Sequence, residues 1–291
     1  MKKITILGGS GFIGSVLSDL LSKNKNFKVV ILDTKKKKPL LKNQKFIKGN
    51  ILSENKLRQA IKGSQYVFNF AALADLDIAK HKPLETASIN ILGTIKALIC
   101  SKDFKVEKFI HASSIYANSE QGGFYGSSKK AAEDYIEKFW KKYKLKFTIL
   151  RFGSLYGPNA GKNNGINFII DNFLKTNHII YKGKKSASRK YIHVEDACYA
   201  CIKSVSKKYD NKYLNITGRK KVKVLSVMKL IANFFDYKKR FIFNNLEIEG
   251  HYVKEPKTFK PRKGKNLFLT KYKNLKNEIK NLIKEKKMNI W

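Results

Sequence analysis

Long hydrophobic runs are missing from this 291-residue sequence. No stretch approaches the roughly 18 consecutive apolar residues that a membrane-spanning helix needs. The first apolar run begins at Ile4 and stops at Gly8, which is too short for the core of a signal peptide. Because 43% of the residues are hydrophobic and 12% are aromatic, the chain can still bury a sizeable core. We therefore expect a globular, cytoplasmic protein with no membrane span.

Acidic residues and arginine are also scarce. The chain has 22 acidic and 61 basic residues, a net charge of +39, and all but six of the basic residues are lysine. Such a charge suggests a nucleic acid or an anionic membrane as partner. Base edges and phosphates, however, are recognised best by the bidentate guanidinium group, and the lysines are spread along the whole chain. We interpret them mainly as solvated surface residues that attract polyanionic substrates, and we expect no specific nucleic-acid partner.

Only three cysteines are present, and two of them, Cys198 and Cys201, form a C-x-x-C pair. A zinc site would need two further ligands, and none has the required spacing. A redox pair would be expected just after a strand, at the start of a helix. The pair instead lies inside an apolar pattern over residues 194–205 that predicts an amphipathic helix. We expect two buried thiols and no metal site.

The first half of the chain alternates short β-rich runs with helical patterns. The β-rich runs are almost continuously apolar, which is typical of strands buried on both faces. This alternation predicts a doubly wound α/β fold of the Rossmann type, a parallel sheet covered by helices on both faces. The predicted strands are 4–7, 28–32, 66–70, 108–112 and 146–150, and the predicted helices are 13–21, 54–61, 83–101 and 129–143.

Beyond residue 150 the alternation becomes less regular. Glycine, asparagine and proline cluster over residues 157–165, which indicates a loop. We expect residues 1–155 to form a dinucleotide-binding domain. Residues 156–291 are expected to form a smaller, substrate-binding lobe that partly interleaves with the Rossmann sheet. The further predicted helices are 166–176, 194–205, 224–235 and 274–286.

A glycine-rich turn joins the first predicted strand to the first predicted helix. A dinucleotide site needs a tight turn after the strand and a position without a side chain, where the pyrophosphate approaches backbone N–H groups. It also needs a third glycine, so that helix and strand pack closely. We expect the cofactor to contact Gly8, Gly11, Phe12, Ile13 and Gly14.

Asp33, at the end of the second strand, indicates which dinucleotide is bound. It follows Gly14 by 19 residues. From this position a carboxylate accepts hydrogen bonds from the adenosine ribose 2′-hydroxyl and repels a 2′-phosphate. The lysines at 35–38 could neutralise such a phosphate, but we interpret them as a solvated loop. NAD is therefore the predicted cofactor, rather than NADP.

A Tyr-x-x-x-Lys pair, Tyr125 and Lys129, lies at the start of a predicted helix. Four residues are about one helical turn, so both side chains lie on one face. The ammonium group favours phenolate and is expected to lower the tyrosine pKa toward neutrality, which makes the phenol a usable acid and base. Upstream, the strand at 108–112 runs into Ser113 and Ser114, where a hydroxyl could hydrogen-bond the reacting oxygen.

These motifs resemble the extended short-chain dehydrogenase/reductase family of NAD-dependent nucleotide-sugar epimerases and dehydratases. The matching segments run from residue 4 to about residue 235 and occur in the same order as in the family. Besides the motifs above, they include Phe70-Ala71-Ala72, Asn90–Thr94, Leu150–Pro158 and Arg189–Asp196.

The resemblance implies roles for individual residues. Ser114 occupies the position of the catalytic serine or threonine, Tyr125 that of the base, and Lys129 that of its electrostatic partner, which also holds the nicotinamide ribose. Arg189 matches an arginine that contacts the substrate diphosphate. The alternative for Arg189 is an ion pair with Glu195 or Asp196. Further implied cofactor contacts are Asn50, Ile51, Phe70, Ala71, Ala72 and Asn90, and further implied substrate contacts are Ser113 and Ser154.

Some positions depart from the family pattern. The asparagine that relatives carry before Tyr-Gly-Pro is Ser154 here. Only ten residues separate Ser114 from Tyr125, which is expected to leave one wall of the sugar pocket open. The family's 4,6-dehydratases follow the catalytic threonine with an Asp-Glu pair, whereas Ile115 and Tyr116 stand here and cannot exchange protons at neutral pH. Dehydration is therefore disfavoured.

Three other polar residues are interpreted as structural. His111 follows an apolar pair inside a strand and is expected to pack there. His193 is expected to hydrogen-bond the backbone, and Arg151 to anchor the loop after its strand.

We expect NAD-dependent epimerisation of a nucleotide-diphosphate sugar, at C4 through a transient 4-keto sugar. The resemblance also implies a homodimer that pairs helices within residues 84–99 and 129–143. One alternative is an NAD(P)H-dependent reductase of a nucleotide-linked ketosugar. A second alternative is a catalytically silent protein that senses a dinucleotide or binds nucleic acid.

Overall fold

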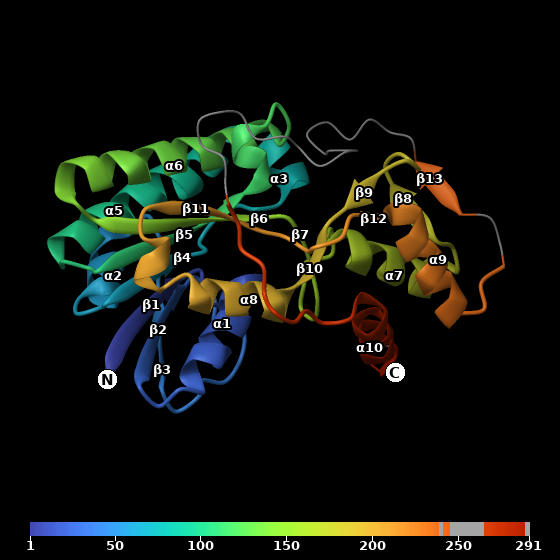
Figure 1. Ribbon diagram of the computed structural model, residues 1–291, viewed down its shortest axis with the longest axis horizontal. Coiled ribbons are helices and arrows are strands. Elements are labelled where there is room, and N and C mark those ends of the chain that lie inside the picture. Colours follow the sequence, from blue (N-terminus) through green and yellow to red (C-terminus); the bar gives the residue numbers. More distant parts are fainter. Residues whose placement is uncertain (239–240, 245–264, 289–291) are drawn as a thin grey trace.

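The computed structural model describes residues 1–238, 241–244 and 265–288. Its centre is a sheet whose strands follow the order β14-β11-β6-β5-β4-β1-β2-β3 (Figure 1), and every pairing in it is parallel. The part from β3 to β6 has the 3-2-1-4-5-6 strand order of doubly wound dinucleotide-binding sheets. The predicted fold class is confirmed. The strands are β1 (Lys2–Leu7), β2 (Phe27–Asp33), β3 (Gln44–Lys48), β4 (Tyr66–Asn69), β5 (Lys108–Ser114), β6 (Lys146–Phe152), β11 (Lys212–Ile216) and β14 (Lys265–Asn266).

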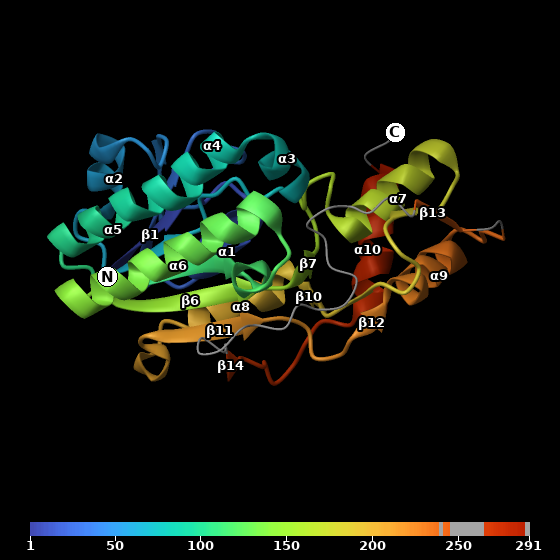
Figure 2. The same ribbon diagram turned by 90° about the horizontal axis from the view of Figure 1, so that it is seen from above.

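Helices cover both faces of this sheet (Figures 1 and 2). On one face, α1 (Phe12–Ser22) and α8 (Val194–Lys203) pack against the strands and against each other. On the other face lie α2 (Glu54–Ile61), α5 (Gly93–Asp103) and α6 (Gly123–Tyr143). The strands are buried on both sides between two apolar cores, which explains why most of them are continuous hydrophobic runs in the sequence.

A second, smaller lobe lies beside the carboxyl ends of the strands (Figure 1). Its helices α7 (Gly165–Thr176), α9 (Val224–Phe234) and α10 (Leu275–Met288) pack around a third apolar core. The chain leaves this lobe twice to add strands β11 and β14 to the large sheet. The boundary at residue 155 remains a prediction. Short strand pairs complete the lobe: β7 (Ser154–Tyr156) with β10 (Tyr191–His193), β8 (Ile180–Lys182) with β13 (Ile242–Asn244), and β9 (Ser188–Arg189) with β12 (Val222–Lys223).

The helix predicted over residues 83–101 is interrupted. It consists of α4 (Pro83–Ala87), a π-helical segment (Ser88–Leu92) and α5. Such π-helical insertions occur frequently at functional sites. A further short helix that the sequence did not predict, α3 (Leu76–His81), begins with Asp75 as its N-cap, whose carboxylate accepts a hydrogen bond from the N–H of Ile78.

Three strands of the large sheet, β3, β11 and β14, were also absent from the sequence-based prediction. In β3 and β11 polar or charged residues interrupt or flank the apolar ones, and each strand is only partly buried, whereas β14 consists of an exposed lysine and an exposed asparagine. Their short sequences do not form the continuous apolar run that identified the central strands.

In the part of the chain that the structure describes, no helix is long and apolar enough to cross a membrane.

Candidate active site

A cleft of about 560 Å³ opens where the strands of the large sheet end and the smaller lobe begins. Its lining starts at the glycine turn after β1, continues along the ends of β5 and β6, and reaches Tyr181 and Arg189 in the smaller lobe. Ligands of open α/β sheets bind outside the carboxyl ends of the strands, at the point where the strand order reverses. This cleft has that position.

The glycine turn brings backbone very close to backbone. Gly8 has φ +77°, and a Cβ atom there would lie 2.6 Å from the backbone nitrogen of Ala71. A Cβ on Gly14 would lie 2.3 Å from the carbonyl oxygen of Gly8, so only glycine allows α1 to pack this closely against β1. Gly8, Gly11 and Gly14 line the cleft, as do Phe12 and Ile13.

The amino end of α1 suits an anionic ligand. Its N-cap is Gly11, which offers no side-chain oxygen to the free N–H groups of the first turn. The only atom within 4 Å of a Cβ built on Gly11 would be the Gly8 carbonyl oxygen, at 3.2 Å. Backbone N–H groups and the helix dipole therefore remain available to a pyrophosphate at this end of the cleft. The residues present fit the predicted dinucleotide.

Asp33 lies next to the glycine turn. Its Oδ2 accepts a hydrogen bond from the backbone N–H of Ser10 at 2.9 Å, so the carboxylate also fixes the turn. A carboxylate has about four acceptor sites, and those that remain can accept the ribose hydroxyls. Of the lysines that follow, Lys38 forms an ion pair with Asp19 on α1, and Lys35 is exposed.

The other predicted cofactor residues lie in two environments. Phe70 and Ala72 line the cleft, and Ala71 packs on Gly8. Asn50 and Ile51 lie outside the lining. The Oδ1 of Asn50 accepts a hydrogen bond from the N–H of Leu52, and the Ile51 side chain is buried in the core beneath α5.

Asn90 is a buried bracing residue in the π-helical segment. Its amide oxygen accepts a hydrogen bond from the Leu73 N–H at 2.8 Å, and its amide nitrogen donates to the Leu73 carbonyl at 3.1 Å. The same nitrogen donates to Ser128 on α6 at 2.9 Å. Asn90 thus ties the loop after β4 to the helix that carries Tyr125 and Lys129.

The predicted catalytic residues meet in the middle of the cleft. Ser114 ends β5, and its hydroxyl hydrogen-bonds the phenol of Tyr125, which stands in the first turn of α6. One turn further, the Nζ of Lys129 donates to the Ala112 carbonyl at 2.9 Å and lies 5.8 Å from the centre of the Tyr125 ring. Lys129 is 2% exposed. The structure therefore brings Ser114, Tyr125 and Lys129 together.

The expected lowering of the Tyr125 pKa is wrong for this cleft. Burial raises the pKa of Tyr125 to about 12, and the hydrogen bond with Ser114 only partly opposes that rise. Lys129 is itself buried, which lowers its own pKa to about 8, while the charge of Glu133 opposes that change. Removal from water outweighs the attraction between ammonium and phenolate, since Lys129 is buried and Tyr125 is partly buried.

The predicted substrate contacts all line the cleft. The hydroxyl of Ser113 is directed into the protein, where it donates to Glu133 at 2.6 Å. Ser154 starts β7, in the wall of the smaller lobe. Arg189 donates to the hydroxyl of Tyr181 at 3.2 Å. Glu195, an alternative ion-pair partner for Arg189, forms an ion pair with Lys273 at 2.6 Å.

The residues interpreted as structural occupy buried positions. His111 stacks on Phe109 within β5, and burial holds its pKa well below the ordinary value. The Nδ1 of His193 accepts a weak hydrogen bond from the Glu195 N–H at 3.4 Å and caps α8. Both cysteines of the C-x-x-C pair are free thiols buried in α8, as predicted. In the described ranges, no cluster of three or more histidine, cysteine or acidic side chains is placed to hold a metal ion.

Sequence reasoning did not identify a contact that spans the cleft. Asp75 in the N-cap of α3 accepts a hydrogen bond from Asn163 of the smaller lobe at 2.8 Å. Both residues line the cleft. The glycine, asparagine and proline residues at 157–165 indicated a loop, but nothing in their pattern identifies a partner 88 residues away.

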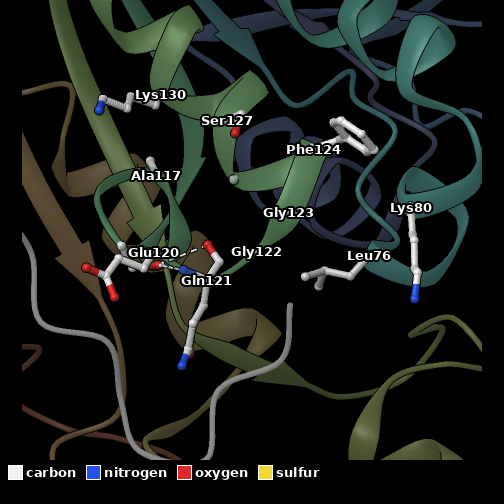
Figure 3. Close-up of a pocket in the computed structure, with 12 residues that line it drawn as sticks. Leu76, Lys80, Ala117, Glu120, Gln121, Gly122, Gly123, Phe124, Ser127 and Lys130 are labelled. Atoms are coloured by element: carbon white, nitrogen blue, oxygen red, sulfur yellow. Dashed lines mark hydrogen bonds between the residues drawn. The ribbon is translucent and has the colours of Figure 1, made fainter. Parts of the chain in front are cut away.

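A second cavity of about 430 Å³ lies beside the catalytic cleft, and Figure 3 shows its lining. The short segment between Ser114 and Tyr125 forms one side of it, and Leu76 and Lys80 of α3 form the other. Leu76 lines both spaces. It packs with Tyr116 and Tyr125 in a small apolar cluster. The short segment therefore leaves open space next to the catalytic residues.

The fold is that of a dinucleotide-binding protein, and one cleft in it brings together Ser114, Tyr125 and Lys129, the predicted catalytic residues. The sequence from residue 4 to residue 217 matches the NAD dependent epimerase/dehydratase family. The match covers well over half of the chain, and the protein belongs to this family of NAD-dependent enzymes.

Known proteins are similar over most of the chain. UDP-glucose 4-epimerase of Thermotoga maritima, solved with UDP-glucose, is 25% identical with a TM-score of 0.82, covering 99% of this chain and 100% of that one. UDP-N-acetylglucosamine 4-epimerase of Methanobrevibacter ruminantium, solved with UDP-N-acetylmuramic acid, is 22% identical with a TM-score of 0.87 and 99% coverage of both chains. A dTDP-D-glucose 4,6-dehydratase of Dictyostelium discoideum is 29% identical; the match covers 80% of this chain and 62% of that protein.

Proposed function

We propose that this protein epimerises a nucleotide-diphosphate sugar at C4, through a transient 4-keto sugar, with NAD that stays bound. The observation that carries the proposal is the continuity of one cleft. It runs from the glycine turn, past Ser114, Tyr125 and Lys129, to Arg189 in the smaller lobe. A dinucleotide at one end and a sugar nucleotide at the other would place the reacting carbon beside the phenol.

The cofactor would lie along the first lobe. The N–H groups at the start of α1 would hold its pyrophosphate, Asp33 its adenosine ribose, and Lys129 its nicotinamide ribose. When bound, NAD⁺ supplies the hydride acceptor and a positive charge on the nicotinamide ring.

Tyr125 would exchange a proton with the sugar hydroxyl. With a pKa raised to about 12, it carries its proton at neutral pH, the form that donates to a 4-keto oxygen. The reverse step needs phenolate, and two neighbours favour that form: the Ser114 hydroxyl donates to it, and the Lys129 ammonium lies one helical turn away. Ser114 would also hydrogen-bond the reacting oxygen.

Arg189 and the polar wall of the smaller lobe would bind the diphosphate. The Arg189 guanidinium donates hydrogen bonds to the Tyr181 hydroxyl and to the Ser188 carbonyl. These bonds fix its orientation in the cleft. A planar guanidinium suits two phosphate oxygens. The relatives from Thermotoga maritima and Methanobrevibacter ruminantium act on UDP-linked sugars by name, which supports UDP sugars as the first substrates to test.

Dehydration has less support, although dehydratases occur among the relatives. The two residues after Ser114 are Ile115 and Tyr116, and both are buried in the apolar cluster beside Leu76. They bring no carboxyl group to the position where elimination of water would need one.

The decisive experiment is to purify the protein and measure bound NAD after denaturation. The same protein is then incubated with UDP-glucose, UDP-galactose, UDP-N-acetylglucosamine and UDP-glucuronic acid. We expect close to one NAD per chain, and conversion of one of these sugars to its C4 epimer by NMR without added cofactor. Protein that arrives without cofactor and consumes NADH with a nucleotide-linked ketosugar would instead be a reductase.

We further propose a cytoplasmic homodimer that pairs residues 84–99 (α4, the π-helical segment and the start of α5) and residues 129–143 of α6 between two copies. Large apolar side chains are exposed along this surface: Leu84 at 81%, Leu92 at 47%, Ile99 at 39% and Tyr135 at 45%. Contiguous exposed apolar residues mark interaction surfaces. Light scattering of the purified protein should give twice the chain mass, 2 × 33.4 kDa, and Leu92→Glu should reduce it to a single chain.

A further inference from the structure

A charged cluster is completely buried behind the catalytic residues, and the proposed chemistry does not use it. Glu133 on α6 and Arg151 on β6 are both 0% exposed. The Nη2 of Arg151 lies 2.6 Å from the Oε2 of Glu133, and its Nε donates to Oε1 at 2.9 Å. This two-point pairing fixes the orientation of both groups.

The Glu133 carboxylate also binds the end of the catalytic strand. Oε1 accepts a hydrogen bond from the Ser113 hydroxyl at 2.6 Å, and Oε2 accepts one from the Asn118 amide at 3.3 Å. With the two bonds from Arg151, four donors converge on the carboxylate, which has about four acceptor sites.

Three successive turns of α6 contact the last three residues of β5, although not in the same order. Tyr125, Lys129 and Glu133 are four residues apart and therefore share one face of the helix. Lys129 binds the Ala112 carbonyl, and Glu133 binds the Ser113 hydroxyl. The next residue of the strand, Ser114, hydrogen-bonds Tyr125.

Arg151 fixes the same arrangement from the neighbouring strand. Ser113 and Arg151 are direct partners in the β5–β6 register. The Arg151 guanidinium lies 4.5 Å from the ring centre of Tyr213 on β11. The Tyr213 hydroxyl, in turn, donates to Glu137, one turn beyond Glu133 on α6.

The location of this cluster matters more than its contribution to stability. A buried ion pair is often no more stabilising than apolar residues of similar size. Here, however, the pair joins the helix that carries Tyr125 and Lys129 to the strand that carries Ser114. We propose that Glu133 is a positioning residue. It fixes the Ser114 hydroxyl against the Tyr125 phenol by holding Ser113 and Arg151, and the inference rests on the proposed epimerase chemistry.

Glu133 also acts on Lys129 through its charge. Burial lowers the pKa of Lys129, and the Glu133 carboxylate opposes that change. The other titratable groups near the ammonium are Tyr125 on the same helix and His111 on β5, and burial keeps His111 neutral. Removing the Glu133 charge should therefore lower the pKa of Lys129 further.

The test uses four variants of the full-length protein. Ser113→Ala removes one hydrogen bond and no charge. Glu133→Gln removes the charge and leaves Arg151 unpaired. The double variant Glu133→Gln/Arg151→Met removes both charges. Glu137→Gln, one turn along α6, is the matched control, because the Glu137 carboxylate accepts its hydrogen bond from the Tyr213 hydroxyl on β11.

For each variant, bound NAD, melting temperature and kcat are measured, with kcat followed as a function of pH. We expect kcat to fall about tenfold in Ser113→Ala with bound NAD unchanged, while the loss of one hydrogen bond to the buried carboxylate lowers the melting temperature without unfolding the protein. In the double variant the melting temperature should recover relative to Glu133→Gln, whereas kcat should stay at least tenfold below the unmodified protein. In Glu133→Gln the alkaline limb of kcat should shift to lower pH, and Glu137→Gln should keep normal kcat and pH dependence.

The inference is overturned if Ser113→Ala and the double variant both turn over at the normal rate with the normal pH profile. Glu133 would then serve stability alone. If the Glu133→Gln protein does not fold, the turnover rates and pH profiles of Ser113→Ala and the double variant decide between a positioning role and a purely stabilising one. The outcome is separate from that of the proposed function, which fails if the unmodified protein epimerises none of the sugars. In that case, NMR titration of labelled lysine, with Lys129 assigned from Lys129→Met, still tests whether Glu133→Gln lowers its pKa.

Discussion

The two ends of the cleft differ in what lines them: mainly backbone at one end and ionisable side chains at the other. The cofactor end consists mainly of backbone: Gly8 and Gly14 let α1 and β1 approach, and the start of α1 is free of a side-chain cap. The catalytic end consists of ionisable side chains deep in the protein, with Lys129 at 2% and Glu133 at 0% exposure. At the first end, space decides which residues are allowed. At the second end, charge and hydrogen bonding decide.

This difference predicts how each end fails. A change at the glycine turn should act by steric clash and show first in cofactor binding. A change in the buried set should act on proton transfer and on pH dependence, with the cofactor still bound. The four predictions below test this contrast.

The largest effect is expected from Tyr125→Phe. The change removes the proton-exchanging hydroxyl but keeps the ring that packs with Leu76 and Tyr116. Because general acid–base catalysis contributes about 10²–10⁴-fold, turnover should fall by that factor. Bound NAD, measured after denaturation, should stay at the normal level. A fully active variant would remove Tyr125 from the mechanism.

Gly14→Ala should strongly weaken cofactor binding. Its Cβ would lie 2.3 Å from the Gly8 carbonyl, and backbone cannot move aside as a side chain does. We expect at least tenfold weaker NAD binding by calorimetry and a loss of about 1–3 kcal/mol in the free energy of unfolding. Gly165→Ala is the control, because a Cβ there meets nothing within 4 Å. Equal NAD affinity in both variants would contradict the steric interpretation.

Lys129→Met should stabilise the fold while it inactivates the enzyme. Burial lowers the pKa of Lys129 from 10.5 to about 8, so the folded state releases a proton that the unfolded state keeps between these values. The unfavourable free energy of burying the charged ammonium is therefore fully present below pH 8, and it is lost as the pH rises toward 10.5. We expect a gain of up to about 3 kcal/mol at pH 7, shrinking at higher pH, in denaturant titrations.

The control for that experiment is Lys130→Met, on the same helix but exposed. It should show no such dependence on pH. A Lys129→Met protein that is less stable by the same amount at every pH would mean that its bond to the Ala112 carbonyl outweighs the cost of burial.

The smallest effect is expected from Asp33→Asn. An amide oxygen can still accept the hydrogen bond from the Ser10 N–H, so the glycine turn should keep its shape. The negative charge that repels a 2′-phosphate is lost. We expect the preference for NAD over NADP to fall by about tenfold in competition binding. An unchanged preference would assign cofactor selection to residues other than Asp33.

Much of the fold could be predicted because local patterns and tertiary structure agree in the first half of the chain. The apolar strands, the glycine turn and the helix that begins near Tyr125 each follow from neighbouring residues. β3 and β11 could not be predicted in this way. They are short and partly buried, and they become strands because an adjacent strand offers unpaired backbone groups. The π-helical segment likewise depends on Asn90 reaching Leu73 and Ser128.

The sequence alone determined the family, and it predicted the dinucleotide site and the pairing of Tyr125 with Lys129, because each of these needs particular residue types at fixed spacing. Only the tertiary structure decided which serine faces the phenol and which faces Glu133, since adjacent residues of a strand point in opposite directions. It also decided the protonation of the site. Sequence predicts that an ammonium lies near Tyr125, but the pKa depends on how completely both groups are removed from water, and that follows from packing between distant parts of the chain.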